Sequence, residues 1–308
     1  MEKLSICIPT YNREEILIKN IINLLGFIEE LNLQKYIEII VSDNCSFSYE
    51  SLESEFKNNS LVTCFTHMEN LGPEKNFYEV VSKAKTEWIM LLGDDDYIQK
   101  EYLGIVFEYI QDPSISVILP NYYVVDGNGN KIDNKYRDKI RPDKVYEKGE
   151  LKLMFKAHQV SGLVFKKRNI LSDYKNNVIP NFYLQMFFVA ENLLAGKCIH
   201  VTRFPLANTV IQKKSVDYDI DMLLDHILYN IKGLPINKKD KMHLYKYAIR
   251  ESIGYRLGNM NSWKHPKKMF EKVNSYALDK NIIRLIKISF IFSYSHMVKQ
   301  KLEKLFIK

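Results

Sequence analysis

Three consecutive aspartates, Asp94 to Asp96, follow an apolar run from Trp88 to Leu92 and the single residue Gly93. Ionised carboxylates this close repel one another and are costly to hold together in a cleft of low dielectric constant. A divalent cation removes that cost. Carboxylate oxygens suit Mg²⁺ or Mn²⁺, which usually take one or two protein carboxylates and complete their shell with water and phosphate. The stretch therefore predicts a Mg²⁺ or Mn²⁺ site. The simpler alternatives are a solvated turn, or capping by Asp94 to Asp96 of a helix that begins near Gln99.

The first 120 residues alternate between two hydrophobic periodicities. Short β-branched and apolar runs predict buried strands at Leu4 to Ile8, Tyr36 to Val41, Leu61 to Thr66, Trp88 to Leu92 and Ile115 to Leu119. The stretches between them are amphipathic. In the first of these, helical spacing predicts one apolar face made of Ile18, Ile21, Ile22, Leu25 and Ile28. Strands alternating with helices predict an α/β fold with a mostly parallel sheet, flanked by helices on both sides.

The remaining chain shows three further patterns. Asn121 to Val125 leads into the turn residues Asp126 to Gly129, which predicts a hairpin. From about 149 to 212 we expect a helix, a short strand at Leu163 to Phe165, a helix near 182 to 195 and a strand after Gly196. Beyond about 216 the pattern is helical. These boundaries divide the chain into residues 1–120, 121–215 and a helical C-terminal region, 216–308.

Polar residues follow each of the early strands. They are Pro9-Thr10-Tyr11-Asn12-Arg13, Ser42-Asp43-Asn44-Cys45-Ser46, Glu69-Asn70-Leu71-Gly72 and Gly93-Asp94-Asp95-Asp96. The carboxyl ends of parallel strands lie along one edge of a sheet, where ligands bind in open α/β folds. We therefore expect these groups to converge on one crevice.

The combination of PTYNR, SDNCS, ENLG and GDDD, in that order, resembles the family-2 glycosyltransferases of the A-type nucleotide-sugar fold. The resemblance covers about the first 120 residues and extends weakly to about 212. It implies a nucleotide-sugar-binding half at 1–120 and an acceptor-binding half at 121–215. It also implies that a nucleoside diphosphate sugar is the donor, with UDP as the default nucleotide.

The resemblance also implies roles for individual residues. Pro9, Tyr11 and Arg13 would line the base and ribose pocket, and Asp43 would accept a hydrogen bond from the base. The segment that passes under the diphosphate would contain Asn70, Gly72 and Lys75, with Asp94 nearby. Each residue also has a simpler explanation. Pro9 can simply end a strand, Tyr11 can be an aromatic residue at the rim of the site, and Arg13 can be an exposed residue at the start of a helix. Asp43 can form an Asx turn, and Gly72 can permit a tight turn.

The acidic motif departs from the pattern of many family members, which have Asp-x-Asp-Asp. Alignment on the following aromatic residue puts Gly93 in place of the first aspartate. Asp95 then becomes the expected direct metal ligand, and Asp94 or Asp96 would act through water or the ribose. A GDDD motif at this position resembles the family members that transfer deoxysugars, such as abequosyltransferases, onto bacterial polysaccharide.

The catalytic base is the second departure. Inverting transfer needs a carboxylate to take the proton from the acceptor hydroxyl. The resemblance implies a carboxylate about ten residues before the Ala195-Gly196 turn, where this chain has Gln185. We consider Glu191, Asp173 and His158 as replacements, although Glu191 can equally be a solvated helix residue and His158 a structural polar group. Ser161 to Phe165 is similar to the family's acceptor-side loop and strand, where a small residue lets the backbone approach the sugar.

Composition and charge set broader limits. The chain has 308 residues, a formal net charge of +7 and four scattered cysteines without a CxxC pair, which argues against a disulfide framework or a zinc site and for a reducing compartment. We expect neither a secretory signal nor a membrane span, hence a cytoplasmic protein. Residues 281–308 combine basic and large apolar side chains. They predict either peripheral contact with an anionic inner membrane face or, through Ile286, Phe290 and Met297, packing onto the catalytic domain.

The first functional hypothesis is therefore a metal-dependent inverting glycosyltransferase that acts on a saccharide, or a lipid-linked oligosaccharide, in assembly of a bacterial surface polysaccharide such as capsule or O-antigen. The second is a catalytically inactive sugar-nucleotide-binding scaffold or partner subunit, which Gln185 keeps open. Nucleotidyl transfer would require a glycine-rich basic phosphate loop after the first strand, and PTYNR does not provide one. We expect no nucleic-acid partner, because no recognition helix or aromatic sheet motif accompanies the net charge. No pattern indicates an oligomeric state.

Overall fold

The computed structural model describes residues 1–126, 129–210, 220–248 and 279–288, together with residues 271, 274 and 291. The chain forms two compact units. The first consists of Met1–Asn176 and Leu184–Ser215, and the second of Asn177–Tyr183 and Val216–Lys308.

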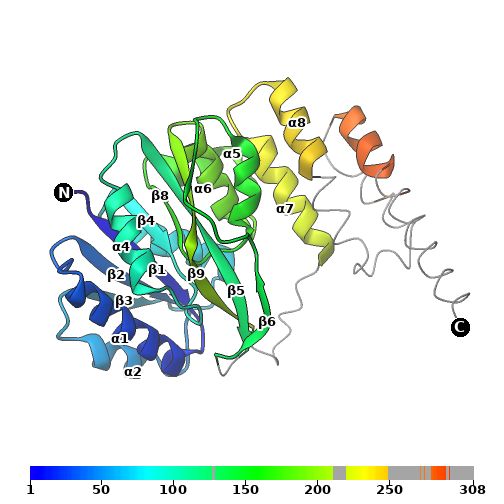
Figure 1. Ribbon diagram of the computed structural model, residues 1–308. Helices are drawn as coiled ribbons and strands as arrows, with labels where there is room; N and C mark the ends of the chain where they lie inside the picture. Colours follow the sequence, from blue (N-terminus) through cyan, green and yellow to red (C-terminus); the bar gives the residue numbers. More distant parts are fainter. Residues whose placement is uncertain are drawn as a thin grey trace, which may run out of the picture. The chain divides into compact units, whose positions relative to one another are not determined.

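The N-terminal part of the first unit alternates strands and helices, as the two periodicities predict. Its elements are β1 (Leu4–Thr10), α1 (Glu14–Glu30), β2 (Ile37–Asp43), α2 (Tyr49–Phe56), β3 (Val62–Thr66), α3 (Pro73–Lys83), β4 (Trp88–Leu91) and α4 (Lys100–Tyr109). The four strands are parallel, in the order β3-β2-β1-β4. Their carboxyl ends therefore lie along one edge, which brings the polar segments after β1, β2 and β4 together (Figure 1).

The rest of the first unit extends this sheet with a mixture of parallel and antiparallel pairs. Its elements are β5 (Ile115–Asp126), β6 (Lys131–Tyr136), β7 (Lys144–Tyr146), the 3-10 helix η1 (Leu151–His158), β8 (Leu163–Lys166), α5 (Ile170–Asn177), α6 (Leu184–Leu193) and β9 (Lys197–Val210). The full order is β3-β2-β1-β4-β8-β5-β9-β7, with β6 paired to β5 as the predicted hairpin. The antiparallel strand β8 joins the parallel half to β5. The structure thus confirms the predicted α/β sheet with flanking helices.

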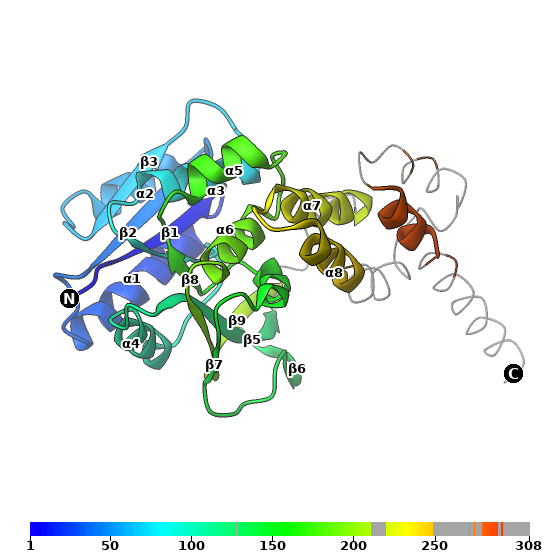
Figure 2. The ribbon, with the colours of Figure 1, turned by 90° about the horizontal axis from the view of Figure 1, so that it is seen from above.

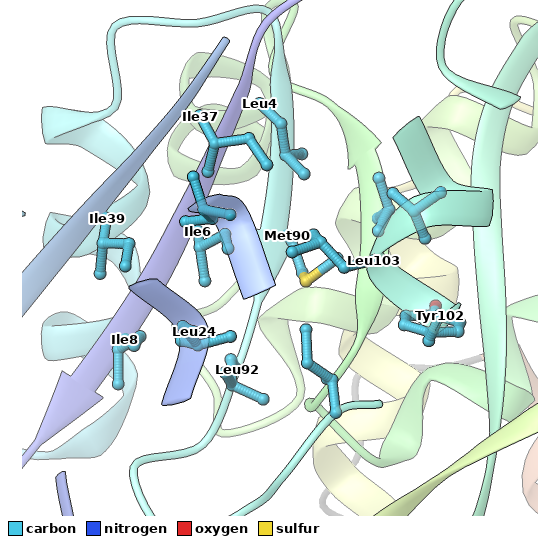
Figure 3. Packing of buried hydrophobic residues seen from close by; sticks show 14 of the residues in the cluster. Leu4, Ile6, Ile8, Leu24, Ile37, Ile39, Met90, Leu92, Tyr102 and Leu103 are labelled. Atoms are coloured by element: carbon cyan, nitrogen blue, oxygen red, sulfur yellow. The ribbon is translucent and has the colours of Figure 1, made fainter. Parts of the chain in front are cut away.

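Helices cover both faces of the sheet. Figure 2 shows α1 and α4 on one side and α3, α5 and α6 on the other. The larger core cluster lies under α1 and α4, where side chains of β1, β2 and β4 meet the helices (Figure 3). Leu4, Ile6, Leu24, Met90 and Tyr102 in this cluster are at most 1% exposed. Burial of one such side chain contributes about 1.5–3 kcal/mol relative to leaving it in water, so this cluster holds the strand ends in fixed positions.

The buried face of α1 differs from the predicted one. Ile21 and Ile28 are buried as expected, but Ile22 is 50% exposed and Ile18 is only half-buried. The buried stripe is instead formed by Leu17, Asn20, Ile21, Leu24 and Ile28. Both sets recur at helical spacing, so periodicity alone did not choose between two overlapping faces. The face that packs against the sheet is the one that contains Leu17 and Leu24.

Gly162 is required by its surroundings and its backbone conformation. Its φ angle is +77°, and an added Cβ would lie 2.5 Å from Cδ2 of Leu206 and 3.3 Å from Cβ of Pro120. Protein side chains therefore fill the space where a Cβ of residue 162 would lie, which gives this glycine a packing role. The expected approach of a sugar to the loop and strand from Ser161 to Phe165 stays a prediction. The left-handed conformation is also costly for any residue with a Cβ.

We predict that Gly162→Ala lowers the free energy of unfolding by about 3 kcal/mol, since the left-handed strain costs about 1–2 kcal/mol and the overpacking about 1–3 kcal/mol. Urea unfolding measures this change. Gly149→Ala is the matched control, because Gly149 has a φ angle of +92° but no atom within 4 Å of the added Cβ. An equal loss in the two variants would contradict the packing role.

The second unit contains α7 (Ile220–Gly233) and α8 (Lys238–Ala248), and residues 280–288 are also helical. Within it, Asn181 donates to the Oδ1 of Asn230 at 2.9 Å, and Leu228, Ile231 and Leu244 are buried. Ile286 of the predicted amphipathic segment is buried too, whereas Phe290 and Met297 lie outside the described residues. Among the helices that the structure describes, none has the length and apolar character needed to cross a bilayer.

Candidate functional site

Asp94 and Asp95 converge on one guanidinium group. The Nη1 atom of Arg13, which lies at the carboxyl end of β1, is 2.8 Å from Oδ1 of Asp94 and 2.8 Å from Oδ2 of Asp95. Thr10, the last residue of β1, donates its hydroxyl to the other oxygen of Asp94 at 2.8 Å. Parallel pairing of β1 with β4 therefore brings together residues that are more than 80 positions apart in the chain.

The carboxylates of Asp94 and Asp95 are costly to ionise in the folded protein, as their adjacent positions in the sequence predict. Burial raises the pKa of Asp94, although the Arg13 guanidinium and the Thr10 hydroxyl oppose this shift. Burial, followed by the negative charges of Asp94 and Asp96, raises the pKa of Asp95 to about 7. One arginine thus compensates the cluster only partly, because it faces more negative charge than it carries.

Asp96 points away from Arg13 and holds β9 and the loop before β8. Its Oδ1 accepts the backbone N–H of Thr209 at 2.7 Å, and its Oδ2 accepts Asn208 Nδ2 at 3.0 Å and the hydroxyl of Ser161. Asn20 of α1 donates to the Asp96 backbone oxygen at 2.8 Å. Asp96 is 6% exposed. Its carboxylate joins the segment after β4 to β9 and to the loop before β8, and its backbone oxygen adds a bond to α1.

The donor set at the cluster fits a hard divalent cation. Asp94 and Asp95 present oxygens that already converge on one positive nitrogen, and Mg²⁺ or Mn²⁺ typically takes one or two protein carboxylates together with phosphate oxygens. Within the described part of the chain, no three His, Cys, Asp or Glu side chains are grouped as they are in a site built from protein ligands alone. The side chain of Asp95, at 16% exposed against 8% for Asp94, is the more accessible of the two.

The loops after β1 and β2 are bound to each other. The Asn12 backbone N–H donates to Ser46 Oγ at 2.7 Å, and its side-chain oxygen accepts the Phe47 N–H at 3.1 Å. Pro9 is buried within β1, whereas the side chain of Tyr11 is 42% exposed at its end. Tyr11 therefore lies on the surface of the linked loops, where a planar base could stack.

Asp43 forms the Asx turn that was the simpler explanation for it. Its carboxylate accepts the backbone N–H of Ser46 at 2.9 Å, the hydroxyl of Ser46, and the hydroxyl of Thr66 at 2.7 Å. The residue is 1% exposed. The structure thus assigns Asp43 a role in shaping the loop after β2, and its predicted contact with a nucleotide base stays a prediction.

The ENLG segment is anchored beside the same loops. Asn44 Nδ2 donates to Asn70 Oδ1 at 2.8 Å, and the same oxygen accepts the Gly72 N–H at 2.9 Å. Gly72, with a φ angle of +80°, precedes α3, which has Pro73 in its first turn. Lys75 follows in this turn and is exposed. This arrangement places backbone N–H groups and an exposed lysine near the N-terminus of α3, an environment that favours anions.

The position expected for the catalytic base is occupied by a buried amide. Gln185 is fully buried, its Nε2 lies 3.5 Å from the backbone oxygen of His158, and its Oε1 has no hydrogen-bond partner among the residues that the structure describes. His158 is brought to the same area. Its Nδ1 lies 3.0 Å from the Phe155 carbonyl, while Nε2 contacts the Arg137 guanidinium and lies 3.4 Å from the Tyr122 hydroxyl.

Glu191 and Asp173 lie together, but away from the aspartate cluster. Burial, and then the nearby Asp173 carboxylate, raise the pKa of Glu191 to about 7. Asn192, the next residue, donates to the backbone oxygen of Lys166 at 2.9 Å, and Lys166 pairs with Trp88 at the start of β4. The aspartates follow the opposite end of β4. The structure therefore does not bring Glu191 or Asp173 to the cluster. His158 lies nearer to it in the chain, three residues before Ser161, whose hydroxyl oxygen accepts the Gly93 N–H at 2.9 Å.

Several residues of the site were not identified from the sequence. Thr10 is part of the PTYNR motif, but no role was assigned to it. Asn20 is a polar residue on the apolar side of α1, and this unusual position could have identified it. Asn208 and Thr209 gave no local signal, because they join Asp96 across more than 110 positions.

Two curated relatives match about half of the chain. Abequosyltransferase RfbV of Salmonella typhimurium is 33% identical over 143 residues, which cover 46% of this chain and 42% of that protein. Poly(ribitol-phosphate) beta-N-acetylglucosaminyltransferase TarP of Staphylococcus aureus is 26% identical over 182 residues, covering 58% of this chain and 50% of that protein. The chain thus spans half or less of the length of these relatives.

Solved structures share the fold over nearly all of the chain. S. aureus TarS 1-349 in complex with UDP-GlcNAc has a TM-score of 0.70 and 14% identity, covering 98% of this chain and 92% of that one. The mannosyltransferase PcManGT from Pyrobaculum calidifontis, in complex with GDP-Man and Mn²⁺, has a TM-score of 0.55 and 14% identity, covering 100% and 88%. At these identities the likeness concerns the fold.

Family assignment comes from the N-terminal part of the chain, which contains β1 to β4 and the aspartate cluster. The model of glycosyl transferase family 2 matches residues 5–174, more than half of the chain, and the protein therefore belongs to this family.

Proposed function

We propose that the protein transfers one sugar from a nucleoside diphosphate sugar to a saccharide acceptor, with inversion at the anomeric carbon and with Mg²⁺ or Mn²⁺ as cofactor. The observation that carries this proposal is the convergence of Asp94 and Asp95 on one cation, Arg13, at the edge where β1, β2 and β4 end. A divalent ion held there by Asp95, with Asp94 beside it, would neutralise the departing diphosphate.

The other residues of the site suit the donor. The linked loops that carry Tyr11 and Asp43 would receive the base and ribose, and the segment of Asn70, Gly72 and Lys75 would lie along the diphosphate. Arg13 already stands between two carboxylates, so we propose that it moves toward the phosphate oxygens when the divalent ion binds. In the transfer itself, the acceptor oxygen bonds to the anomeric carbon, the bond to the diphosphate breaks, and the acceptor proton passes to a base.

The biological setting is proposed by analogy with the relatives. RfbV is named as an abequosyltransferase, and TarP as a transferase of N-acetylglucosamine to poly(ribitol phosphate). We propose that this protein acts in the cytoplasm on a bacterial surface polysaccharide or its lipid-linked precursor, with peripheral membrane contact through the C-terminal region.

Thermal unfolding tests the donor site. We predict that Mn²⁺ together with one of UDP, CDP, GDP or dTDP raises the melting temperature by about 5 °C, because a ligand at a hundred times its dissociation constant adds about 2.7 kcal/mol to the stability of the folded state. The other nucleotides, and Mn²⁺ alone, should give smaller shifts. A flat response to the whole panel would contradict the proposed donor site.

A second candidate is favoured by Gln185. This amide is buried at the position expected for the base and takes no proton at neutral pH, so a sugar-nucleotide-binding scaffold without transfer activity remains consistent with the site. Release of nucleoside diphosphate from a panel of nucleotide sugars separates the two candidates. Slow hydrolysis that requires Mn²⁺ indicates an enzyme, while binding without any hydrolysis indicates the scaffold.

A further inference from the structure

A cationic and aromatic cluster lies in the acceptor half, and the donor site does not use it. It consists of Arg137, after β6, Tyr122 on β5, and His158 at the end of η1. The guanidinium carbon of Arg137 lies 5.3 Å from the centroid of the Tyr122 ring, and its Nη2 lies 3.3 Å from Nδ1 of His158, while Nη1 contacts Nε2. We name these three residues the Arg137 cluster.

The described contacts of the Arg137 guanidinium are with the Tyr122 ring and the His158 imidazole. Among the described residues, no carboxylate pairs with its guanidinium, although it is exposed. Nearby cations are compensated: Lys156 contacts Asp138 at 2.8 Å, and Arg203 contacts Asp143 at 2.7 Å. An exposed arginine that pairs with no described carboxylate keeps its charge for an external anion.

The cluster is held in place rather than free to move. The backbone N–H of Arg137 donates to the Tyr122 carbonyl at 2.9 Å. The next residue, Asp138, is fixed by Asn121, which accepts its N–H at 2.9 Å and donates to its carbonyl at 2.8 Å. Because the backbone and the ring under it are fixed, ligand binding would cost little side-chain entropy.

A short relay connects the Arg137 cluster to Asp96. Gln159 directly follows His158, its Oε1 lies 3.5 Å from Asn208 Nδ2, and that amide donates to Asp96 at 3.0 Å. Burial raises the pKa of Tyr122, and the charges of Asp138 and, to a smaller extent, Asp96 add to this shift, which agrees with the proximity of Asp96. A group bound at Arg137 would therefore lie on the acceptor side of the aspartates.

We propose that the Arg137 cluster binds a phosphate group carried by the acceptor. This inference rests on the proposed transferase function and specifies its substrate class as a phosphate-bearing saccharide. The planar guanidinium presents paired N–H donors that match two phosphate oxygens, and the imidazole of His158 lies beside it as a second nitrogen group. The phosphate comes either from a phosphodiester within a polymer or from the diphosphate of a lipid carrier.

Binding of simple probes tests this proposal on the full-length protein. With the donor site saturated by Mn²⁺ and the nucleotide identified above, calorimetry compares methyl α-glucoside 6-phosphate with methyl α-glucoside. We expect binding of the phosphorylated probe alone, and Arg137→Ala should weaken it at least tenfold, since a hydrogen bond to a charged group contributes about 1.5–3 kcal/mol. A glycerol phosphate oligomer and a short prenyl diphosphate then distinguish the polymer source from the carrier source.

Lys131→Ala is the matched control. Lys131 is another exposed cation of the same hairpin and lies 4.5 Å from the centroid of the Tyr123 ring, so nonspecific attraction would weaken equally in both variants. Equal weakening, equal binding of the neutral sugar, or unchanged binding by Arg137→Ala would each overturn the proposal. Asp95→Ala separates this proposal from the proposed function. If Asp95→Ala loses the nucleotide response but still binds the phosphorylated probe, the Arg137 cluster remains supported. The Arg137 cluster is also supported if Arg137→Ala loses phosphate binding and keeps a normal nucleotide response.

Discussion

Asp95→Ala is expected to abolish the Mn²⁺-dependent part of the nucleotide-induced rise in melting temperature and to lower sugar transfer or donor hydrolysis by about 1000-fold or more. The carboxylate of Asp95 is the more accessible of the two that meet at Arg13. If it is the direct ligand, its removal deprives the leaving diphosphate of its neutralising ion. A loss of several kcal/mol of transition-state stabilisation corresponds to this decrease, because each 1.4 kcal/mol is a factor of ten.

The fold should tolerate this substitution. Arg13 keeps its contact with Asp94 when Asp95 is absent, and burial makes Asp95 costly to ionise in the first place. We therefore expect the melting temperature without ligands to stay the same or rise slightly. Asp95→Asn, which keeps the size but removes the charge, should behave like the alanine variant in the metal-dependent assays. An undiminished response to Mn²⁺ in both variants would show that the ion binds elsewhere.

Asp96→Ala is expected to lower the free energy of unfolding by about 2–4 kcal/mol. It leaves the Ser161 hydroxyl, the Asn208 amide and the Thr209 N–H without their common acceptor, and an unsatisfied buried donor costs about 1–3 kcal/mol. The alanine variant no longer has to bury a carboxylate, which offsets part of this loss of stability. Burial raises the pKa of Asp96, which shows that the buried charge is unfavourable. Denaturant unfolding gives the free energy directly.

Asp96→Asn is the control for this prediction. Its amide oxygen can still accept the Thr209 N–H, and the Ser161 hydroxyl can reverse and accept from the amide nitrogen, so we expect a loss of about 1 kcal/mol. Activity should fall in both variants, because β9 and the loop before β8 lose part of their attachment to the aspartate cluster. Equal stability of the wild type and the alanine variant would mean that this network contributes nothing to the fold.

The sequence determined the elements of the N-terminal part and the chemistry at their ends. Apolar runs located β1 to β4 to within one or two residues, and the motif after β4 identified the acidic cluster. These features are local. A buried strand needs a continuous apolar run, and repelling carboxylates in adjacent positions are visible without any knowledge of the fold.

Tertiary contacts decided the direction in which each polar side chain points. Arg13 meets Asp94 and Asp95, Asp96 turns to β9, and Arg137 stacks on Tyr122 because sheet pairing brings distant residues together. The same contacts chose the buried face of α1 and separated Glu191 from the aspartates. Such choices depend on the partner that packing supplies at each position, and a partner more than a hundred residues away leaves no trace in the local pattern of the chain.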